Sequence, residues 1–185
     1  MAVQPQPHRF SVDEYYGMAE AGLLGEEARL ELIDGEIIDM TPIGSRHAAC
    51  LGRLKLSFEG LGHRAIVRIR EPVRLDEYDE PQPDLAVVEY RTDFYAAGHP
   101  EPEGVLLVVE VADTSAVYDR SVKIPLYARA GIREAWLVDM AGRRLEIHRT
   151  PSPEGYRHTQ EMRPGDRCAP AALPDVFVDA GDLVD

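Results

Sequence analysis

The chain has 185 residues, and its 33 acidic and 20 basic side chains give a formal net charge of −13. This length is typical of one domain with a core that needs no metal or disulfide, so we interpret residues 1–185 as a single domain. The acidic excess argues against a protein that coats nucleic acid with a broad basic surface, although it allows a local basic groove. No signal-like N-terminus and no apolar run near 18 residues is present, which predicts a protein without membrane association.

The cysteines and lysines are few, and the positions of the cysteines argue against a disulfide-bonded or zinc-binding protein. Cys50 and Cys168 lie outside any CxxC or Cys/His motif. We interpret them as reduced packing residues of a cytoplasmic protein, and their isolation argues against structural zinc. Only two basic residues are lysines, Lys55 and Lys123, whereas 18 are arginines.

The N-terminus predicts a leader followed by a helix. Residues 1–8 are rich in Pro and Gln, and we expect them to be disordered. Ser11 and Glu14 have capping-box spacing, and Gly22 suits the position after a helix end. These signals predict a helix over residues 12–21.

A hairpin and a second helix are predicted next. The segment "RLELIDGEIIDM" (29–40) alternates on both sides of Asp34-Gly35, which is the strongest short hairpin signal in the chain. Residues 45–62 place apolar side chains at helical spacing and end at Gly62, which predicts a helix.

The middle of the chain predicts strands followed by a helix. Strand-like segments cover residues 65–75, 83–90 and 104–112. Thr114 or Ser115 caps a helix that runs to about residue 129. Within it, Pro125 must kink or restart the helix because it lacks a backbone donor.

The C-terminal part predicts more strands. Residues 134–139 and 144–150 bracket a turn and indicate a hairpin, and residues 155–162 give a weaker strand signal. We expect the Pro-rich tail over 169–185 to pack as an irregular edge. Together, the elements predict an α/β (α+β) fold with a mixed sheet flanked by helices.

The strand "GVLLVVEVADTS" carries an acidic residue in an apolar setting. Its aliphatic side chains leave no polar face, yet Glu110 lies in the middle. A buried carboxylate is costly unless a partner compensates it or it takes up a proton. Glu110 therefore indicates either a functional site or a buried partner, for which an Arg is the alternative.

Two further acids are candidates for the same site. Asp84 begins the apolar strand "PDLAVVEY", and if this strand pairs with that of Glu110, their carboxylates can approach one ion. Glu31 lies in "LELI" just before the hairpin turn. Oxygen ligands of this kind suit Mg²⁺ or Mn²⁺ rather than Zn²⁺. Each acid has a structural alternative: Asp84 as a turn residue and Glu31 on an exposed hairpin face.

Lys123 and His47 complete the candidate set. Lys123 follows the Glu110 strand on the predicted helix, where an ammonium can orient a water or neutralise charge on a phosphate. Its alternative is a solvated lysine paired with Asp119 four residues earlier. His47 stands near the start of the second predicted helix, and its alternative is a cap or a packed ring.

These residues resemble a known nuclease pattern. A Pro-Asp at a strand start followed by a Glu in the next strand resembles the PD-(D/E)xK nucleases, in which a Lys follows the acid by two residues. Here that position is Ala112. The chain resembles more closely the Uma2 (DUF820) family, through "RFSVDEYYGMAE", "RLELIDGEIIDMTPIGSRHAACLGRL", "PQPDLAVVE", "LLVVEVADTS" and "DRSVKIPLYARAGIREAWLVD".

The resemblance implies a restriction-endonuclease-like core and a site. It places the catalytic lysine on the helix after the acidic strand, at Lys123. The positions carried over are Glu31, His47, Asp84, Glu110 and Lys123, with Asp84, Glu110 and Glu31 as metal ligands.

The function that follows is a Mg²⁺- or Mn²⁺-dependent endonuclease that hydrolyses phosphodiester bonds, with DNA as substrate and a homodimer as the expected assembly. Arg68 and Arg70, with Arg64 and Arg74 nearby, offer a basic strand face for DNA, or else an ordinary solvated face. The alternative function is a non-catalytic homo-oligomeric binding module that keeps the nuclease fold, which the charge of −13 favours.

Overall fold

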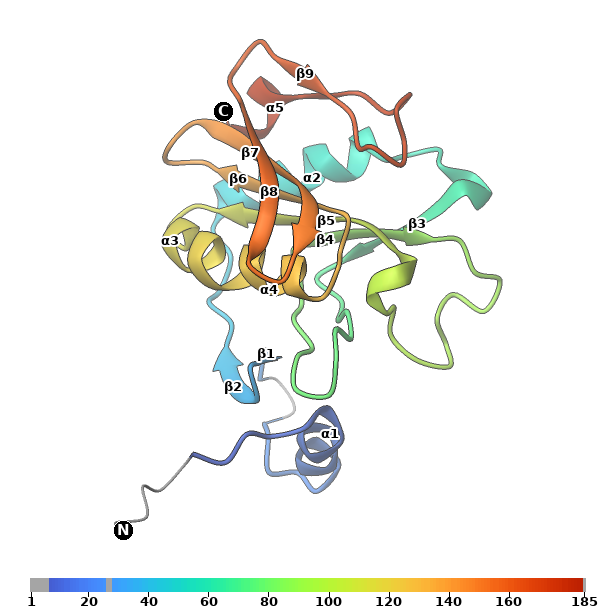
Figure 1. The fold of residues 1–185 in the computed structure, drawn as a ribbon, viewed down its shortest axis with the longest axis vertical. Helices are drawn as coiled ribbons and strands as arrows, with labels where there is room; N and C mark the ends of the chain where they lie inside the picture. Colours follow the sequence, from blue (N-terminus) through green and yellow to red (C-terminus); the bar gives the residue numbers. More distant parts are fainter. Residues whose placement is uncertain (1–6, 26–27, 185) are drawn as a thin grey trace.

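A six-stranded mixed sheet forms the centre of the molecule, with the strand order β3-β4-β5-β6-β7-β8 (Figure 1). The computed structural model describes residues 7–25 and 28–184, so most of the predicted leader lies outside the described residues. Only β5 and β6 are parallel neighbours in this sheet, and the other pairs are antiparallel. The strands are β3 (Ala65–Ile69), β4 (Leu85–Glu89), β5 (Val105–Ala112), β6 (Glu134–Asp139), β7 (Arg144–Ser152) and β8 (Gly155–Met162).

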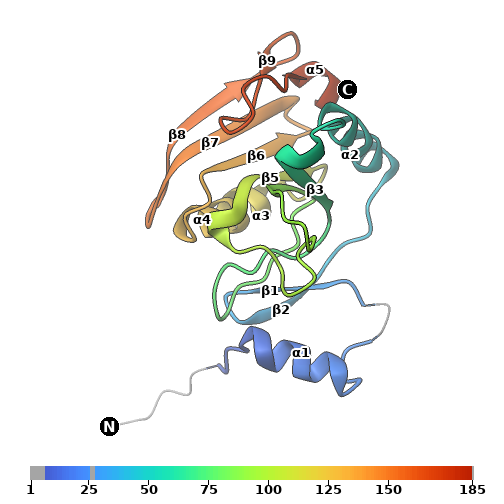
Figure 2. The same ribbon diagram turned by 90° about the vertical axis from the view of Figure 1, so that its right-hand side faces the viewer.

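Helices cover both faces of this sheet (Figure 2). Side chains of α2 and α5 join the apolar core on one face, and side chains of α4 join the core on the other. The predicted mixed sheet flanked by helices is therefore confirmed. The helical elements are α1 (Val12–Glu20), α2 (Ser45–Ser57), η1 (Gly62–Arg64), η2 (Pro102–Gly104), α3 (Ala116–Tyr118), η3 (Asp119–Lys123), α4 (Ile124–Arg129) and α5 (Ala180–Val184).

The alternation of β5 determines where its acidic residue points. Val109 and Val111 belong to the core on the α2 side, and Val108 and Ala112 belong to the core on the α4 side. Successive side chains of a strand point to opposite faces. Glu110 therefore faces the α4 side, where the chain returns as a helix after β5.

The N-terminal helix and hairpin form as predicted. Ser11 caps α1 in a complete capping box with Glu14. Strands β1 (Leu30–Ile33) and β2 (Glu36–Asp39) pair in an antiparallel hairpin. Asp34 and Gly35 take φ values of 52° and 73°, the left-handed conformation that this pair of residues favours in a two-residue turn.

Two predicted elements end earlier than expected. The predicted strand over 65–75 stops at Ile69, because Arg70 has a φ of 54° and Pro72 cannot donate a ladder hydrogen bond. The predicted helix over 45–62 stops at Ser57, and the chain then turns through Gly60 at a φ of 83°. A residue in the left-handed conformation follows directly after the strand and lies three positions beyond the end of the helix.

The C-terminal tail is more regular than predicted. Strands β9 (Arg167–Cys168) and β10 (Val178–Asp179) pair, and α5 follows directly. Leu183 and Val184 of α5 are buried in the core on the α2 side. Their apolar contacts, which the Pro-rich composition did not reveal, stabilise this short helix.

The helix predicted after β5 is interrupted. A short α3 leads into the π-helix η3, and α4 begins at Ile124 with Pro125 in its first turn. The amide of Ile124 donates to the carbonyl of Asp119, five residues earlier, as a π-helix requires. Of the two outcomes expected at Pro125, a kink or a restart, the structure has the restart.

None of the helices in the described part of the chain has the length and apolar character needed to cross a bilayer.

Candidate active site

The structure brings all five candidate residues to one cavity of about 530 Å³. They arrive from separate places in the fold: a hairpin strand, the first turn of α2, the residue before β4, the strand β5 and the π-helix. The cavity is lined among others by Glu31, His47, Asp84, Glu110 and Lys123.

The β1–β2 hairpin is held against the loop before β4, and this contact delivers Glu31. Leu32 and Glu80 form an isolated antiparallel bridge. Next to it, the backbone N–H of Gln82 donates to Oε2 of Glu31 at 3.0 Å. Glu31 is only 5 % exposed. The alternative of an exposed hairpin residue is therefore wrong.

The pairing of β4 with β5 brings Asp84 next to Glu110. Leu85 lies opposite Val109 in this antiparallel pair, so the preceding residue, Asp84, falls beside Glu110 in the register. Asp84 is held from two sides. Its Oδ1 lies 2.9 Å from Nε2 of His47, and its Oδ2 accepts from the Val111 amide at 2.9 Å.

Lys123 lies between two carboxylates instead of extending into solvent. Its Nζ is 3.0 Å from Oε1 of Glu110 and 3.1 Å from Oε2 of Glu31. Its side chain is 5 % exposed, so the alternative of a solvated helix lysine is wrong. The partner of Glu110 is this lysine, not the buried arginine considered as the alternative. Tyr127, one turn later, donates its hydroxyl to the same Oε1 of Glu110.

Burial and neighbouring charges set the protonation of this cluster. Burial, reinforced by the nearby Asp84, Asp119 and Glu31, raises the pKa of Glu110 to about 8, although Lys123 opposes the change. Burial alone would lower the pKa of Lys123, but the surrounding carboxylates outweigh it and raise that pKa above its ordinary value. Lys123 therefore stays charged, while Glu110 is poised to release a proton near neutral pH.

The cavity wall is rich in negative charge. Its acidic residues are Glu31, Asp39, Asp84, Glu110, Asp113 and Asp119, whereas its permanently basic ones are Arg70 and Lys123. Such a cavity repels a polyanion unless a cation or a proton compensates the excess.

The donor set suits a hard divalent cation. Mg²⁺ is commonly held by one or two carboxylates and keeps several waters, which Asp84 and Glu110 can satisfy. Within the described residues, no three His, Cys, Asp or Glu side chains form a cluster able to hold a metal on their own. The residues therefore fit a cation that completes its shell with water or substrate oxygens.

Asp119 and Arg70 line the cavity, and Tyr127 supports it through Glu110, but none of the three was among the predicted site residues. Asp119 is buried, accepts a hydrogen bond from Ser115, and has a pKa raised by burial. Asp119, Lys123 and Tyr127 are spaced four residues apart in the sequence. This spacing places them on one face of a helix, and it could have indicated that Asp119 and Tyr127 belong to the site of Lys123. Arg70 was considered only as part of a basic strand face.

That basic strand face is not present. Arg70 leaves the strand and lines the cavity, with Nε 3.7 Å from Oδ1 of Asp84. Arg68 is buried and pairs with Glu71. Arg64 and Arg74 pair with Asp175 and Asp13. The four arginines therefore do not form a shared surface for DNA.

The fold and the site define an α/β protein of restriction-endonuclease-like architecture, with an acidic cavity where the start of β4 and the strand β5 meet the π-helix. The chain belongs to the Uma2 family, whose model, described as "putative restriction endonuclease", matches residues 12–181.

One solved structure that is similar is described as a "putative nuclease belonging to DUF820" from Anabaena variabilis ATCC 29413. It has a TM-score of 0.73 and 17 % sequence identity, and the match covers 95 % of this chain and 97 % of that chain. At this identity the likeness shows the fold. No curated protein matches the chain.

Proposed function

We propose that this chain is a metal-dependent nuclease that hydrolyses phosphodiester bonds in DNA in the cytoplasm. The observation that carries the proposal is the position of Lys123, whose ammonium lies against Glu110 in the cavity that Asp84 also lines. The description of the family and that of the Anabaena protein as a nuclease support the same class of reaction.

Asp84 and Glu110 would hold Mg²⁺ or Mn²⁺, with Glu31 as a supporting ligand or as the carboxylate that holds Lys123. When bound, the metal would polarise a phosphoryl oxygen and lower the pKa of a coordinated water.

The chain's own groups would arrange the rest of the site. Lys123 stays protonated and can orient the attacking water or neutralise charge on the phosphate. His47 fixes the orientation of the Asp84 carboxylate through their 2.9 Å contact. Arg70, beside Asp84, is available for a phosphate oxygen.

Incubation of the purified protein with supercoiled plasmid and Mn²⁺ tests the proposal. We expect nicked and linear products with wild type and none with Asp84→Ala. A matched control is Asp175→Ala, because Asp175 is an exposed aspartate outside the cavity, paired with Arg64. Absence of cleavage by wild type with any of Mg²⁺, Mn²⁺ or Co²⁺ would contradict the proposal.

A second candidate is a non-catalytic homo-oligomeric binding module. The formal charge of −13 and the pairing of Arg64, Arg68 and Arg74 with acids favour it, because both weaken attraction of DNA. Light scattering of the purified protein gives its assembly, for which the nuclease proposal expects a homodimer. An oligomer that cleaves neither DNA nor RNA would favour the module.

A further inference from the structure

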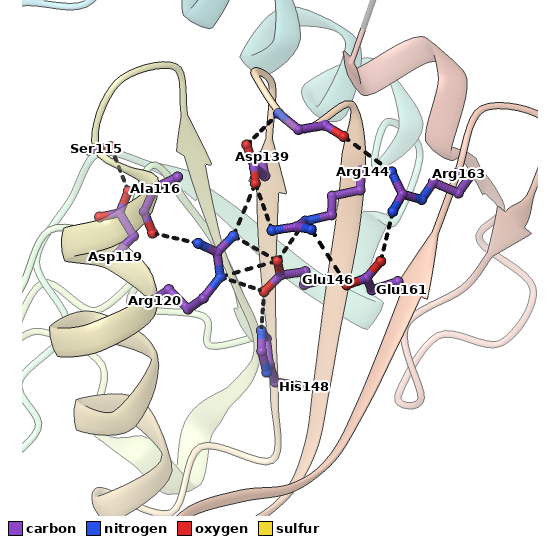
Figure 3. Close-up of polar contacts among 11 residues, drawn as sticks. Ser115, Ala116, Asp119, Arg120, Asp139, Arg144, Glu146, His148, Glu161 and Arg163 are labelled. Atoms are coloured by element: carbon purple, nitrogen blue, oxygen red, sulfur yellow. Dashed lines mark hydrogen bonds and ion pairs between the residues drawn. The ribbon is translucent and has the colours of Figure 1, made fainter.

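The π-helix η3 presents different side chains to two parts of the molecule. Asp119 and Lys123 line the cavity. Arg120 points instead to the end of the sheet formed by β6 and β7 (Figure 3). The segment is thus attached to the sheet on one side of the helix and carries cavity residues on another.

Arg120 forms several hydrogen bonds with two buried carboxylates. Its Nη2 donates to Oε1 of Glu146 at 2.7 Å and to Oδ2 of Asp139 at 3.0 Å, and its Nε lies 3.2 Å from both oxygens of Glu146. Its Nη1 also lies 3.4 Å from the carbonyl of Ala116, one turn earlier. The guanidinium therefore joins the helix to the ends of two strands. This geometry suits the planar guanidinium, whose N–H groups can donate to several carboxylate oxygens at once.

Arg144 binds the same carboxylates from the sheet itself. It lies 3.1 Å from Asp139 and 2.9 Å from Glu146, but it belongs to β7, as Glu146 does. Removing Arg144 takes a cation away from this network without detaching the helix. The chain thus contains a matched control for the role of Arg120.

We propose that Arg120 is a positioning residue, which holds the π-helix against β6 and β7 so that the Lys123 ammonium stays between Glu110 and Glu31.

The proposal follows from the cost of burying Lys123. Its long side chain gains hydration and rotamer freedom if it leaves the cavity, and its ion pairs with Glu110 and Glu31 form only while the backbone that carries it stays in place. The π-helix lies between the three-residue α3 and the six-residue α4, and the three form one continuous helical segment from Ala116 to Arg129. A helical segment of this length is only marginally stable on its own, so its rotation depends on tertiary contacts. Arg120 supplies a contact three residues before Lys123.

Lysine modification tests the proposal without nucleic acid or metal. Lys55 is exposed on α2 and serves as the internal reference. The protein is treated with limiting N-hydroxysuccinimidyl acetate in EDTA, and peptide mass spectrometry gives the ratio of the Lys123 rate to the Lys55 rate. The variants are Arg120→Met, which keeps an apolar stem, and the control Arg144→Met. Circular dichroism establishes that each is folded.

We expect the ratio to rise by at least about tenfold in Arg120→Met, because local opening exposes Lys123, and to change by less than about twofold in Arg144→Met. An unchanged ratio in folded Arg120→Met, or an equal rise in Arg144→Met, would overturn the proposal. If Arg120→Met does not fold, Glu146→Gln takes its place: a raised ratio supports the proposed role of Arg120, and an unchanged ratio rejects it.

The catalytic consequence of this inference rests on the proposed function, but the lysine ratio does not. If the wild type also cleaves DNA, Arg120→Met should lower kcat and leave KM within about twofold. If the wild type cleaves nothing but the variants show the expected ratios, only the proposed nuclease function is refuted. If the wild type cleaves DNA but Arg120→Met leaves the ratio unchanged, only the proposed role of Arg120 is refuted.

Discussion

The ammonium of Lys123 lies 3.0 Å from Oε1 of Glu110, although one residue comes from a π-helix and the other from a central strand, and both side chains are almost fully buried. A second carboxylate, Glu31, contacts the same ammonium. One buried cation is therefore shared by two acids, and it does not offset the effect of burial, which together with the nearby acids keeps the pKa of Glu110 above its ordinary value.

Replacing Glu110 by Gln should change how stability depends on pH. The pKa of Glu110 is raised from 4.5 to about 8, so between these values the folded chain binds more protons than the unfolded chain. The free energy of unfolding of wild type therefore falls as the pH rises through this window. Glu110→Gln cannot titrate, so its stability relative to wild type should increase from about pH 5 to about pH 8.5.

Urea unfolding of both proteins at several pH values, in EDTA, measures this difference. Other titrating groups, such as Asp119, are common to the two proteins and largely cancel. Parallel stability curves would mean that Glu110 is ionised throughout. A large destabilisation of Glu110→Gln at every pH would mean that its charge is needed to hold Lys123.

Lys123 should be irreplaceable for cleavage. Lys123→Met removes the cation that forms an ion pair with Glu110, and we expect no detectable cleavage. It should not weaken Mn²⁺ binding, because every carboxylate remains. Lys123→Arg should also be inactive, since a planar guanidinium does not fit a position shaped around a compact ammonium.

Lys55→Met is the control for these variants, because it removes the other lysine of the chain from an exposed position. Plasmid cleavage and Mn²⁺ titration by calorimetry give the two readouts. Wild-type rates in Lys123→Arg would reduce the role of Lys123 to general charge compensation.

Mn²⁺ should stabilise the folded protein through Asp84. A ligand bound only by the folded state adds about 2.7 kcal/mol at a free concentration a hundredfold above its Kd. Asp84→Asn should lose most of this gain, and Asp175→Asn should keep it. Thermal melts of the three proteins with EDTA and with Mn²⁺ measure the gain, and a wild type that does not respond to the metal would exclude the metal site.

Arg70 should contribute to DNA binding. It lines the cavity beside Asp84, and among the described residues its buried Nε has no hydrogen-bond partner. With Ca²⁺ in place of Mn²⁺ to prevent cleavage, Arg70→Met should weaken binding of a short duplex by about tenfold at moderate salt.

Arg64→Met is the matched arginine control, because the guanidinium of Arg64 already forms a two-point contact with Asp175. Fluorescence anisotropy at two salt concentrations compares the two variants. Equal affinities of Arg70→Met and wild type would place the phosphate outside the reach of Arg70.

Much of the fold follows from local sequence signals. The turn at Asp34-Gly35 and the capping box of Ser11 act through the backbone within a few residues, so their elements form where the pattern predicts. The apolar run around Glu110 predicted a buried strand, and the cost of a charge in such a strand marked this residue for function before any contact was known.

Tertiary structure alone decided how the site is assembled. The bridge between Leu32 and Glu80 brings Glu31 into the cavity, and the π-turn with its Arg120 contact turns Lys123 inward. These contacts join residues distant in the chain, and no local propensity encodes them. Whether a carboxylate or an ammonium is buried depends on which opposite charges the fold brings within about 3–4 Å, and the sequence alone leaves that distance undetermined.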